Sequence, residues 1–330
     1  MRGLGDRTFL LRPMPPKVIR ANRGATRQQL QTVRRAVGRL GDARIQNKTR
    51  FRYYYAAACF QYWLTRHGGL PALSFEDLDH QLSEYVEWLW DGGFAKNEAG
   101  DCLSGVQHFL RVKRKFPTAW ALFRQWTMLE PPCRAPPIPL VVLFGMVGAA
   151  KTAGLMSVCV VLLTAFGCFL RTNEALSLQP WQFHFNSSRS VLVVTLGWTK
   201  SAGKRGAVDS IVCDDPYIVR LVAFFLPLCP AHLPLVESAS RFQIIFQALI
   251  VAVDASPLNL RQYSLRRGGA TYAYSEGVPL DAVIERGRWN SISTARIYIN
   301  HGLQEIGLTL LSPNSRRLCT RFGQELAQLI

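Results

Sequence analysis

The sequence predicts a mainly helical protein of two domains, the second of which contains a small antiparallel sheet. The division follows from helical patterns that fill the chain up to about residue 129 and from five prolines that then fall within residues 131–139. The sheet follows from residues 190–198, which alternate enough to form a strand, and from glycines at 203 and 206 before a second strand at 208–212. With 330 residues, 48% of them hydrophobic, the chain is long enough to bury two cores.

The first domain is predicted to span residues 26–130, after a basic extension over residues 1–25 in which three prolines discourage regular structure. Four helices are expected, over residues 26–44, around 53–63, over 74–90 and over 95–113. Ser74 is the predicted N-cap of the third, with Asp77 in its first turn. Aromatic residues recur at helical spacing and are therefore expected in the core: Tyr55, Phe60, Trp63, Tyr85 and Trp88.

The second domain is predicted to span residues 140–330, beyond a proline-rich linker at 131–139. Two helical segments lead to Arg171, and the second of them, residues 155–170, is apolar enough to resemble a membrane span. It is slightly short for one and runs directly into Arg171 and Glu174, which favours a buried helix. After the hairpin, helices are expected at 216–226, 240–253, from 263 onward, at 278–286 and around Tyr298.

The charge of the chain is strongly positive and unevenly placed. The net charge is +17, and residues 1–52 contain fourteen Lys and Arg against Asp6 and Asp42. Such a bias suits a polyanion, because each neutralised phosphate releases counterions. Charge alone leaves three interpretations open, namely a DNA contact, an RNA contact and a solvated basic arm.

The cysteines and the N-terminal residues carry no sign of a metal centre or of secretion. The eight cysteines form no Cys-x-x-Cys pair and no His/Cys cluster, so reduced, buried thiols and no bound metal are expected. Residues 1–20 lack the continuous apolar core of a secretory signal. An intracellular protein without membrane association is therefore expected.

Three short motifs become informative in combination. The first is Arg171-Thr-Asn-Glu174, the second Tyr263-Ser-Leu-Arg266, and the third places Trp289 nine residues before Tyr298; Lys200 lies between the first two, near the hairpin. Each has an ordinary interpretation by itself, such as an ion pair on a helix surface or a half-buried aromatic residue. The order Arg, Lys, Arg, Trp, Tyr at these separations makes a common site the better interpretation.

This ordered set resembles the tyrosine recombinases, also called the phage integrase family. The likeness covers residues 140–300 well and the preceding hundred residues in outline. It implies a SAM-like helical core-binding bundle followed by a mixed α+β catalytic domain, the DNA breaking-rejoining fold. One position departs from the family pattern, because the second box of the family is usually His-x-x-Arg and Tyr263 stands at the histidine position.

The resemblance also implies a role for each matched residue. Arg171 and Arg266 would hold the non-bridging oxygens of a phosphodiester, since guanidinium groups stay charged and offer paired donors. Tyr298 would be the nucleophile, and Lys200 the general acid for the leaving 5′-oxygen, with Lys204 and Arg205 as alternatives.

The remaining matched positions are expected to support these groups. Trp289 would donate its one indole hydrogen bond to a phosphate oxygen, and Glu174 would orient Arg171 or its helix. Tyr263 could still donate a hydrogen bond to the phosphate, although it is a weaker base than histidine near neutral pH.

Further basic residues are candidates for contact with the DNA backbone. Those predicted to bind DNA are Arg44, Lys48, Arg50, Arg52, Arg111, Lys113, Arg114, Lys115, Lys204 and Arg205. The expected partner is double-stranded DNA, bound by a homotetramer on paired sites, and neither a cofactor nor a nucleotide is implied. The tail over residues 303–330 is amphipathic in parts and, as in similar enzymes, is expected to dock on a neighbouring subunit.

One segment imitates a phosphate-binding loop. Residues 145–152 read Gly-Met-Val-Gly-Ala-Ala-Lys-Thr after a strand-like stretch, but Ala150 stands where that loop has glycine before its lysine. A helix interior with Lys151 exposed is the favoured interpretation.

Three functions remain in competition. The leading hypothesis is a metal-independent, site-specific recombinase or integrase of mobile-element origin. A catalytically impaired DNA-binding descendant is the second, because of Tyr263, and a type IB topoisomerase, which shares the chemistry, is the third.

Overall fold

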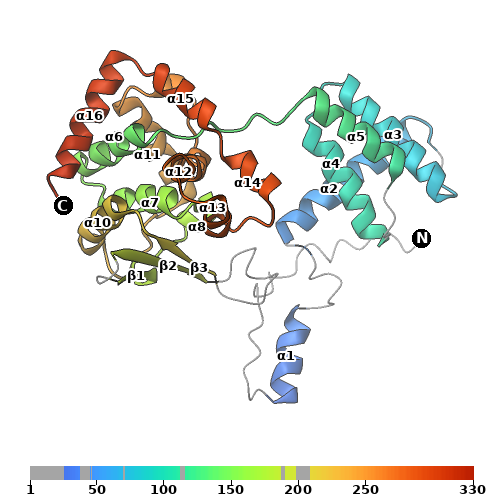
Figure 1. The fold of residues 1–330 in the computed structure, drawn as a ribbon. Helices are drawn as coiled ribbons and strands as arrows, with labels where there is room; N and C mark the ends of the chain where they lie inside the picture. Colours follow the sequence, from blue (N-terminus) through green and yellow to red (C-terminus); the bar gives the residue numbers. More distant parts are fainter. Residues whose placement is uncertain are drawn as a thin grey trace. The chain divides into compact units, whose positions relative to one another are not determined.

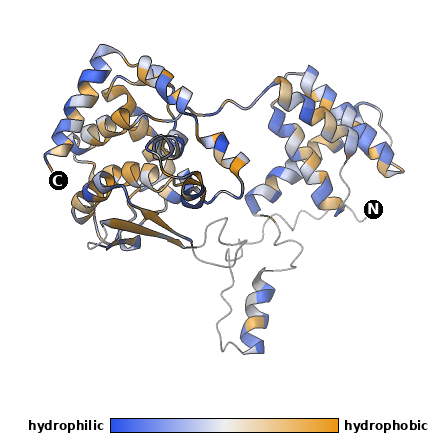
Figure 2. Cartoon of the chain, in the orientation of Figure 1, coloured by the Kyte–Doolittle hydropathy of each residue, from blue (hydrophilic) through white to orange (hydrophobic). Residues whose placement is uncertain are grey.

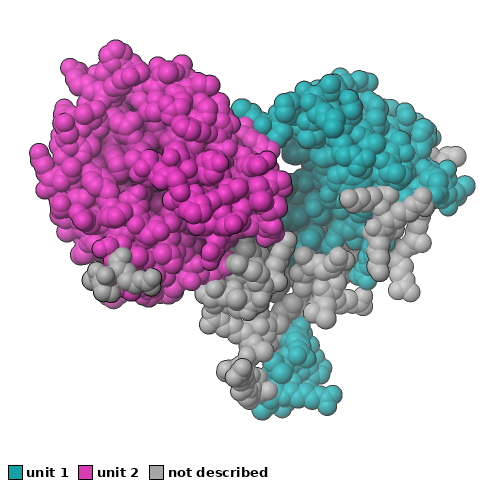
Figure 3. All heavy atoms as spheres, viewed as in Figure 1, with its two compact units in different colours: residues 1–133 teal, residues 134–330 magenta. Residues whose placement is uncertain are grey.

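The computed structural model describes residues 26–37, 45, 47–69, 71–111, 116–186, 190–197 and 209–330. The chain divides into two compact units, residues 1–133 and 134–330 (Figure 3). Several predicted features lie outside the described residues: the basic extension over 1–25, the end of the first predicted helix, and the turn at 203–206. In the part of the chain that is described, no helix is long and apolar enough to cross a membrane.

Unit 1 is helical, with α3 packed on α5 and α2 on α4 (Figure 1). Its helices are α1 (Arg27–Val37), α2 (Asn47–Arg66), α3 (Phe75–Asp91), α4 (Lys96–Leu110) and α5 (Pro117–Leu129). Ser74 caps α3 as predicted: its hydroxyl accepts from the Asp77 N–H, and the Asp77 carboxylate accepts from the Ser74 N–H. The sequence analysis missed α5, although Pro117 at its first turn is a helix-start signal.

The core of unit 1 contains most of the aromatic residues that were predicted there. Phe60 and Tyr85 are buried, and Trp63 and Trp88 are half-buried against them. The prediction was wrong for Tyr55, whose surface is 64% exposed. Tyr55 lies on the face of α2 that also exposes Phe51 and Tyr62, so this helix has aromatic residues on two sides.

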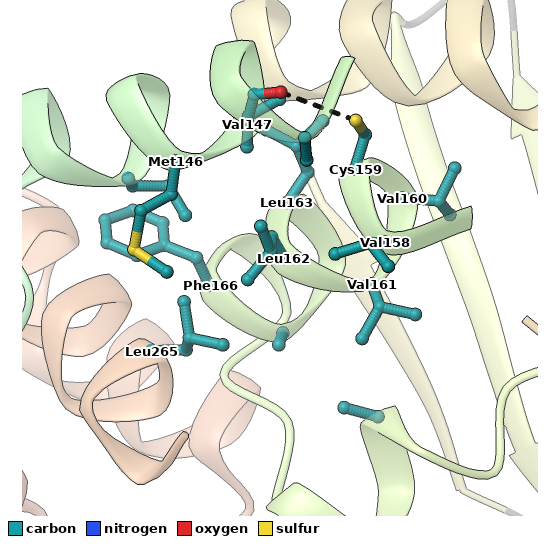
Figure 4. Packing of buried hydrophobic residues seen from close by; sticks show 14 of the residues in the cluster. Met146, Val147, Val158, Cys159, Val160, Val161, Leu162, Leu163, Phe166 and Leu265 are labelled. Carbon is teal, nitrogen blue, oxygen red and sulfur yellow. Dashed lines mark hydrogen bonds between the residues drawn. The ribbon is translucent and has the colours of Figure 1, made fainter. Parts of the chain in front are cut away.

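Unit 2 is built around α7 (Met156–Gly167), a helix whose residues from Val158 onward are all buried. Figure 4 shows its apolar side chains between Met146 and Val147 on one side and Leu265 on another. The prediction of a buried helix leading to Arg171 is thereby confirmed. In Figure 2, α7 and the neighbouring strands are among the most hydrophobic parts of the ribbon, consistent with this central position.

A three-stranded antiparallel sheet of order β1-β2-β3 lies in unit 2, as the predicted fold class requires. The strands are β1 (Phe183–Asn186), β2 (Val191–Gly197) and β3 (Asp209–Cys213), of which only β1 was not predicted. Leu192 and Val194 of β2 face the core, and Leu192 pairs with Cys213 of β3. A register irregularity lies between Thr195 and Gly197, close to the segment that contains Lys200.

The sheet lies at one edge of unit 2, and the remaining helices of the unit lie around α7 (Figure 1). They are α6 (Leu140–Thr152), α8 (Thr172–Ala175), α10 (Pro216–Phe225), α11 (Ala239–Ala252), α12 (Tyr263–Ser275), α13 (Leu280–Gly287), α14 (Ile292–Tyr298), α15 (His301–Thr309) and α16 (Pro313–Ala327), with short 3-10 turns at Pro180–Gln182, Leu226–Leu228 and Ser256–Leu258. The helices predicted at 216–226, 240–253, from 263 and at 278–286 are all present within a few residues.

The C-terminal helix α16 packs against α6 of its own chain. A Cβ atom added to Gly145 would lie 2.6 Å from Cys319 Sγ, and one added to Gly148 would lie 2.5 Å from Phe322 Cβ. These glycines, which resemble those of a phosphate-binding loop in the sequence, lie inside α6 and allow α16 to approach α6 closely. Lys151 lies near the end of the same helix and is half-buried. Buried residues of α16, such as Cys319 and Phe322, are thus covered by α6 within the unit, and docking of the tail on a neighbouring subunit stays a prediction.

The predicted linker is only partly a connector. Residues from Arg134 onward belong to unit 2, where Ile138 is fully buried and its N–H donates to the Ser264 carbonyl at 3.2 Å. The second half of the proline-rich stretch thus fixes the start of α12.

Candidate active site

Helix α12 carries two residues that were predicted for the site and a third residue that is adjacent to one of them in the sequence. Tyr263 is its first residue, and Arg266 and Arg267 follow within one turn. The next two residues, Gly268 and Gly269, leave no room for a side chain: an added Cβ would lie 2.4 Å from the Ile138 carbonyl oxygen and 2.0 Å from that of Phe166. Gly269 therefore seats α12 on the end of α7 and Gly268 seats it on Ile138, which places Arg266 beside the residues that follow α7.

Arg266 is the centre of the arrangement, and its side chain is buried. Its guanidinium donates to the carbonyl of Phe169 and, at 2.6 Å, to the carbonyl of Gly287, so it joins the end of α7 to the end of α13. Burial, together with the charges of Arg171 and Arg288, lowers its pKa to about 10. The group consequently remains a cation at neutral pH, although it is nearly sealed from water.

Tyr298, the last residue of α14, lies against this cation. Its ring stacks on Trp289 at 4.7 Å between centroids, and the guanidinium carbon of Arg266 lies 5.2 Å from the Tyr298 ring centroid. The Arg266 carbon is also 5.0 Å from the Trp289 ring. The phenol ring of Tyr298 and the indole ring of Trp289 thus both lie against the buried guanidinium of Arg266.

The hydroxyl of Tyr298 lies 2.6 Å from the hydroxyl of Tyr263. Burial raises the pKa of Tyr263 to about 12, and its hydrogen bond with Tyr298 contributes in the same direction. A phenol that holds its proton so firmly acts as a donor, so Tyr263 can stabilise negative charge on the Tyr298 oxygen. The histidine position of the family pattern therefore holds a donor to the predicted nucleophile.

Arg171 and Glu174 form a compact unit at the start of α8. The Glu174 carboxylate accepts from the Arg171 N–H at 2.8 Å and from its guanidinium Nη1 at 2.7 Å. The Arg171 side chain remains 32% exposed, whereas the Glu174 side chain is 11% exposed. The carboxylate thus holds both the backbone and the side chain of the arginine.

A further arginine that the sequence analysis did not select, Arg288, reaches the same carboxylate. Its Nη2 donates at 2.8 Å to Glu174 Oε2, the oxygen that also accepts from the Arg171 N–H, whereas the Arg171 guanidinium is bound by Oε1. Burial raises the pKa of Glu174, but the hydrogen bond and charge of Arg288 and the hydrogen bonds of Arg171 outweigh burial, and the pKa is lowered overall. Only its place immediately before Trp289 could have drawn attention to Arg288 in the sequence.

Several buried donors of this cluster have no hydrogen-bond partner among the residues that the structure describes. They are Arg266 Nε, Arg267 Nε, Arg288 Nε and Nη1, and Trp289 Nε1. Buried polar atoms are normally paired, and each atom left unpaired is costly. Donors that converge with a phenol and remain unsatisfied make a region suited to an oxyanion, whose oxygens accept several hydrogen bonds at once.

Lys200 lies between β2 and β3 and outside the described residues, as do Lys204 and Arg205. The predicted general acid and its alternatives therefore have no described place. The structure brings together Arg171, Glu174, Tyr263, Arg266, Trp289 and Tyr298.

The basic residues predicted to bind DNA in unit 1 have mixed surroundings. Arg44 and Lys113, Arg114 and Lys115 lie outside the described residues. Lys48 and Arg111 are exposed, and Arg50 is half-buried. Arg52 makes a two-pronged ion pair with Asp101, with Nε at 2.9 Å and Nη2 at 2.6 Å, so this charge joins α2 to α4.

Comparison with known proteins gives matches at the level of the fold alone. No family model matches the sequence, and no curated protein does. Among solved structures, the XerH site-specific recombinase bound to difH substrate in a pre-cleavage complex is 13% identical, with 87% of this chain and 85% of that chain covered and a TM-score of 0.50.

Two further solved structures are similar to a lesser degree. The post-cleavage complex of XerH is 14% identical, covers 82% of this chain and 80% of that chain, and has a TM-score of 0.48. The Tn1549 transposon integrase in complex with circular intermediate DNA is 12% identical, covers 72% and 83%, and has a TM-score of 0.46. On the strength of the pre-cleavage complex, this chain has the fold of a tyrosine recombinase.

Proposed function

We propose that this chain is a site-specific DNA recombinase or integrase that breaks and rejoins strands through a 3′-phosphotyrosyl link to Tyr298. One observation carries the proposal: the Tyr298 hydroxyl is 2.6 Å from a second phenol, and its ring lies 5.2 Å from a buried guanidinium. A nucleophile, a proton-holding partner and a fixed cation are the parts that phosphoryl transfer by side chains requires.

The proposed reaction begins with attack of the Tyr298 oxygen on the phosphorus of a phosphodiester, and the phenolic proton of Tyr298 passes to water. The phosphorus–5′-oxygen bond breaks, the 3′-phosphate stays on the tyrosine, and the released 5′-oxygen takes a proton from Lys200. Arg171 and Arg266 bind the non-bridging oxygens as negative charge grows on them, and Trp289 adds one indole donor. A 5′-hydroxyl from another strand then reverses the step, and because the phosphodiester energy is conserved, the reaction uses neither ATP nor a metal.

The substrate in this proposal is double-stranded DNA with two paired sites, bound by four copies of the chain at a place in the cell where DNA is accessible. The exposed Lys48 and Arg111 of unit 1 would contact the DNA backbone. Support comes from the net charge of +17 and from the likeness in fold to XerH, which was solved bound to its difH substrate.

Covalent capture from a mixed pool of DNA tests the proposal and requires no defined target sequence. The full chain is incubated with a library of randomised duplexes and denatured, and DNA that remains attached to protein is recovered and sequenced. Nicked duplexes built on the recovered sequences then accumulate the adduct, because the short strand beyond the nick diffuses away. We expect the adduct to map to Tyr298 and to fall at least about 10³-fold in Tyr298→Phe, which lacks the attacking oxygen.

The matched control is Tyr274→Phe, which removes the hydroxyl of an exposed tyrosine on α12 and should leave the adduct unchanged. Salt-sensitive duplex binding with no adduct in the unmodified chain would instead identify the impaired descendant, which Tyr263 favours. Plasmid relaxation by the monomer, without paired sites, would identify a type IB topoisomerase.

A further inference from the structure

Arg288 occupies a backbone conformation that favours glycine. It ends α13 with φ 54° and ψ 43°, in the left-handed region, where a side chain on the Cβ atom is unfavourable. Its long side chain is nevertheless almost entirely buried, with 5% exposed. Both features oppose an arginine at this position, so the side chain must make contacts that offset them.

The contact that Arg288 makes is with the carboxylate that holds Arg171. Glu174 accepts from the Arg288 guanidinium at 2.8 Å through one oxygen and from the Arg171 guanidinium at 2.7 Å through the other. One arginine of this triad is nearly sealed, and the other is 32% exposed. The two arginines are 117 residues apart in the sequence. Arg288, at the end of α13, therefore holds the Glu174 carboxylate in place, and Glu174 in turn orients the side chain of Arg171 at the start of α8.

Arg288 also determines the net charge of the triad. Arg171 and Glu174 alone form a neutral pair, and Arg288 makes the group of three positive. Two donors of Arg288, Nε and Nη1, have no hydrogen-bond partner within the described part of the chain, and the positive charge of Arg288 helps to lower the pKa of Arg266. A neutral pair would attract a phosphodiester anion less than a positive triad does.

We propose that Arg288 is a positioning residue for the scissile phosphate: it anchors Glu174, keeps that carboxylate ionised, and thereby holds the Arg171 guanidinium where it meets the phosphate oxygens. This inference rests on the proposed function. In this role Arg288 acts on the phosphate through Glu174.

Substitution by glycine gives a direct test, because Arg288→Gly removes the side chain and at the same time relieves the backbone. We expect the rate of adduct formation to fall about 100-fold, since a small displacement of a group that binds the transition state is enough for that loss. Arg288→Lys, which keeps the charge but not the planar fork, should lose about 10-fold. The matched control is Asn259→Gly, at an exposed left-handed residue of the same unit, which should stay within about twofold.

The pH profile separates positioning from a merely structural role. Glu174 faces Arg171 from α8 and Arg288 from the end of α13, while Arg286 of the same helix end pairs instead with Asp214. The hydrogen bond and charge of Arg288 are the strongest influences that lower the pKa of Glu174, so loss of Arg288 should leave that pKa higher than in the unmodified chain. The rate of adduct formation should therefore decline as the pH is lowered from about 8 to about 5. The midpoint of this decline should lie at a higher pH in Arg288→Gly than in the unmodified chain.

Glu174→Gln combined with Arg288→Gly should abolish that additional decline, because no carboxyl remains to be protonated. An unchanged rate and pH profile in Arg288→Gly would overturn the inference, even if Tyr298→Phe had confirmed the function. So would an equal loss in Asn259→Gly, or a loss explained by a fall in the folded fraction measured by circular dichroism.

Failure of the function itself is distinguishable. If the unmodified chain forms no adduct with any duplex, titration with orthovanadate, a phosphate-like oxyanion, decides the inference by calorimetry. Binding about tenfold weaker in Arg288→Gly than in Asn259→Gly would support it. Equal affinity of those two variants, or no vanadate binding by the unmodified chain, would overturn it.

Discussion

The two units use their carboxylates differently. In unit 1, Asp101 pairs with Arg52, and the carboxylate of Asp79 accepts from the N–H groups of Thr118 and Ala119 at the start of α5. In unit 2, by contrast, the Glu174 carboxylate serves two arginines, and buried Arg266 is held by carbonyl oxygens. The described carboxylates of the first unit thus hold parts of the fold together, whereas the cluster of the second unit contains buried guanidinium donors without a partner among the described residues.

The strongest challenge to this comparison is Arg266→Lys. We expect adduct formation to fall about 10²- to 10³-fold, because the buried fork beside Tyr298 is lost. Stability should fall less, by about 1–2 kcal/mol, since one of the carbonyls of Phe169 and Gly287 would lack a donor. Single-turnover kinetics and urea unfolding of the same preparation measure both quantities, and the comparison breaks if stability changes but the rate does not.

The opposite pattern is expected for Asp79→Ala in unit 1. This residue is buried, and its loss leaves the first N–H groups of α5 without an acceptor, so the free energy of unfolding should decrease by about 2 kcal/mol. The single-turnover rate on saturating duplex, measured below the unfolding transition, should change less than about threefold if this charge serves only the fold. A large rate loss without loss of stability would show that unit 1 also holds charges for catalysis.

The smallest effect is expected at Tyr263, whose hydroxyl shares a hydrogen bond with the hydroxyl of Tyr298. Tyr263→Phe should slow adduct formation about 10-fold and leave DNA affinity nearly unchanged. In the unmodified chain the Tyr263 pKa of about 12 keeps this donor protonated at all pH values below about 11, so it adds no pH dependence near neutrality.

Tyr263→His should introduce a pH dependence near about 6.5, with the protonated imidazole acting as donor below that value and losing its charge above it. A full pH–rate profile measures this difference. Identical profiles for Tyr263→His and the unmodified chain would place residue 263 outside the hydrogen-bond network of the nucleophile.

Local sequence signals predicted most of the fold, because their physical cause lies within a few residues. The Ser74–Asp77 capping box and the apolar run of α7 are of this kind, and both are present in the structure. Tyr55 shows the limit, since helical spacing places an aromatic residue on a face but does not say which face is buried. The four-residue strand β1 is too short to show a clear alternation.

The order of residues along the chain was enough to identify the chemical groups of the site, namely Arg171, Glu174, Arg266, Trp289 and Tyr298. What those groups touch depends on the packing of the helices. The ion pair of Arg288 joins residues 114 positions apart, and the hydroxyl contact of Tyr263 with Tyr298 spans 35. Neither separation has a period that a sequence can show, because contacts of this range depend on how helices pack and not on how one helix repeats.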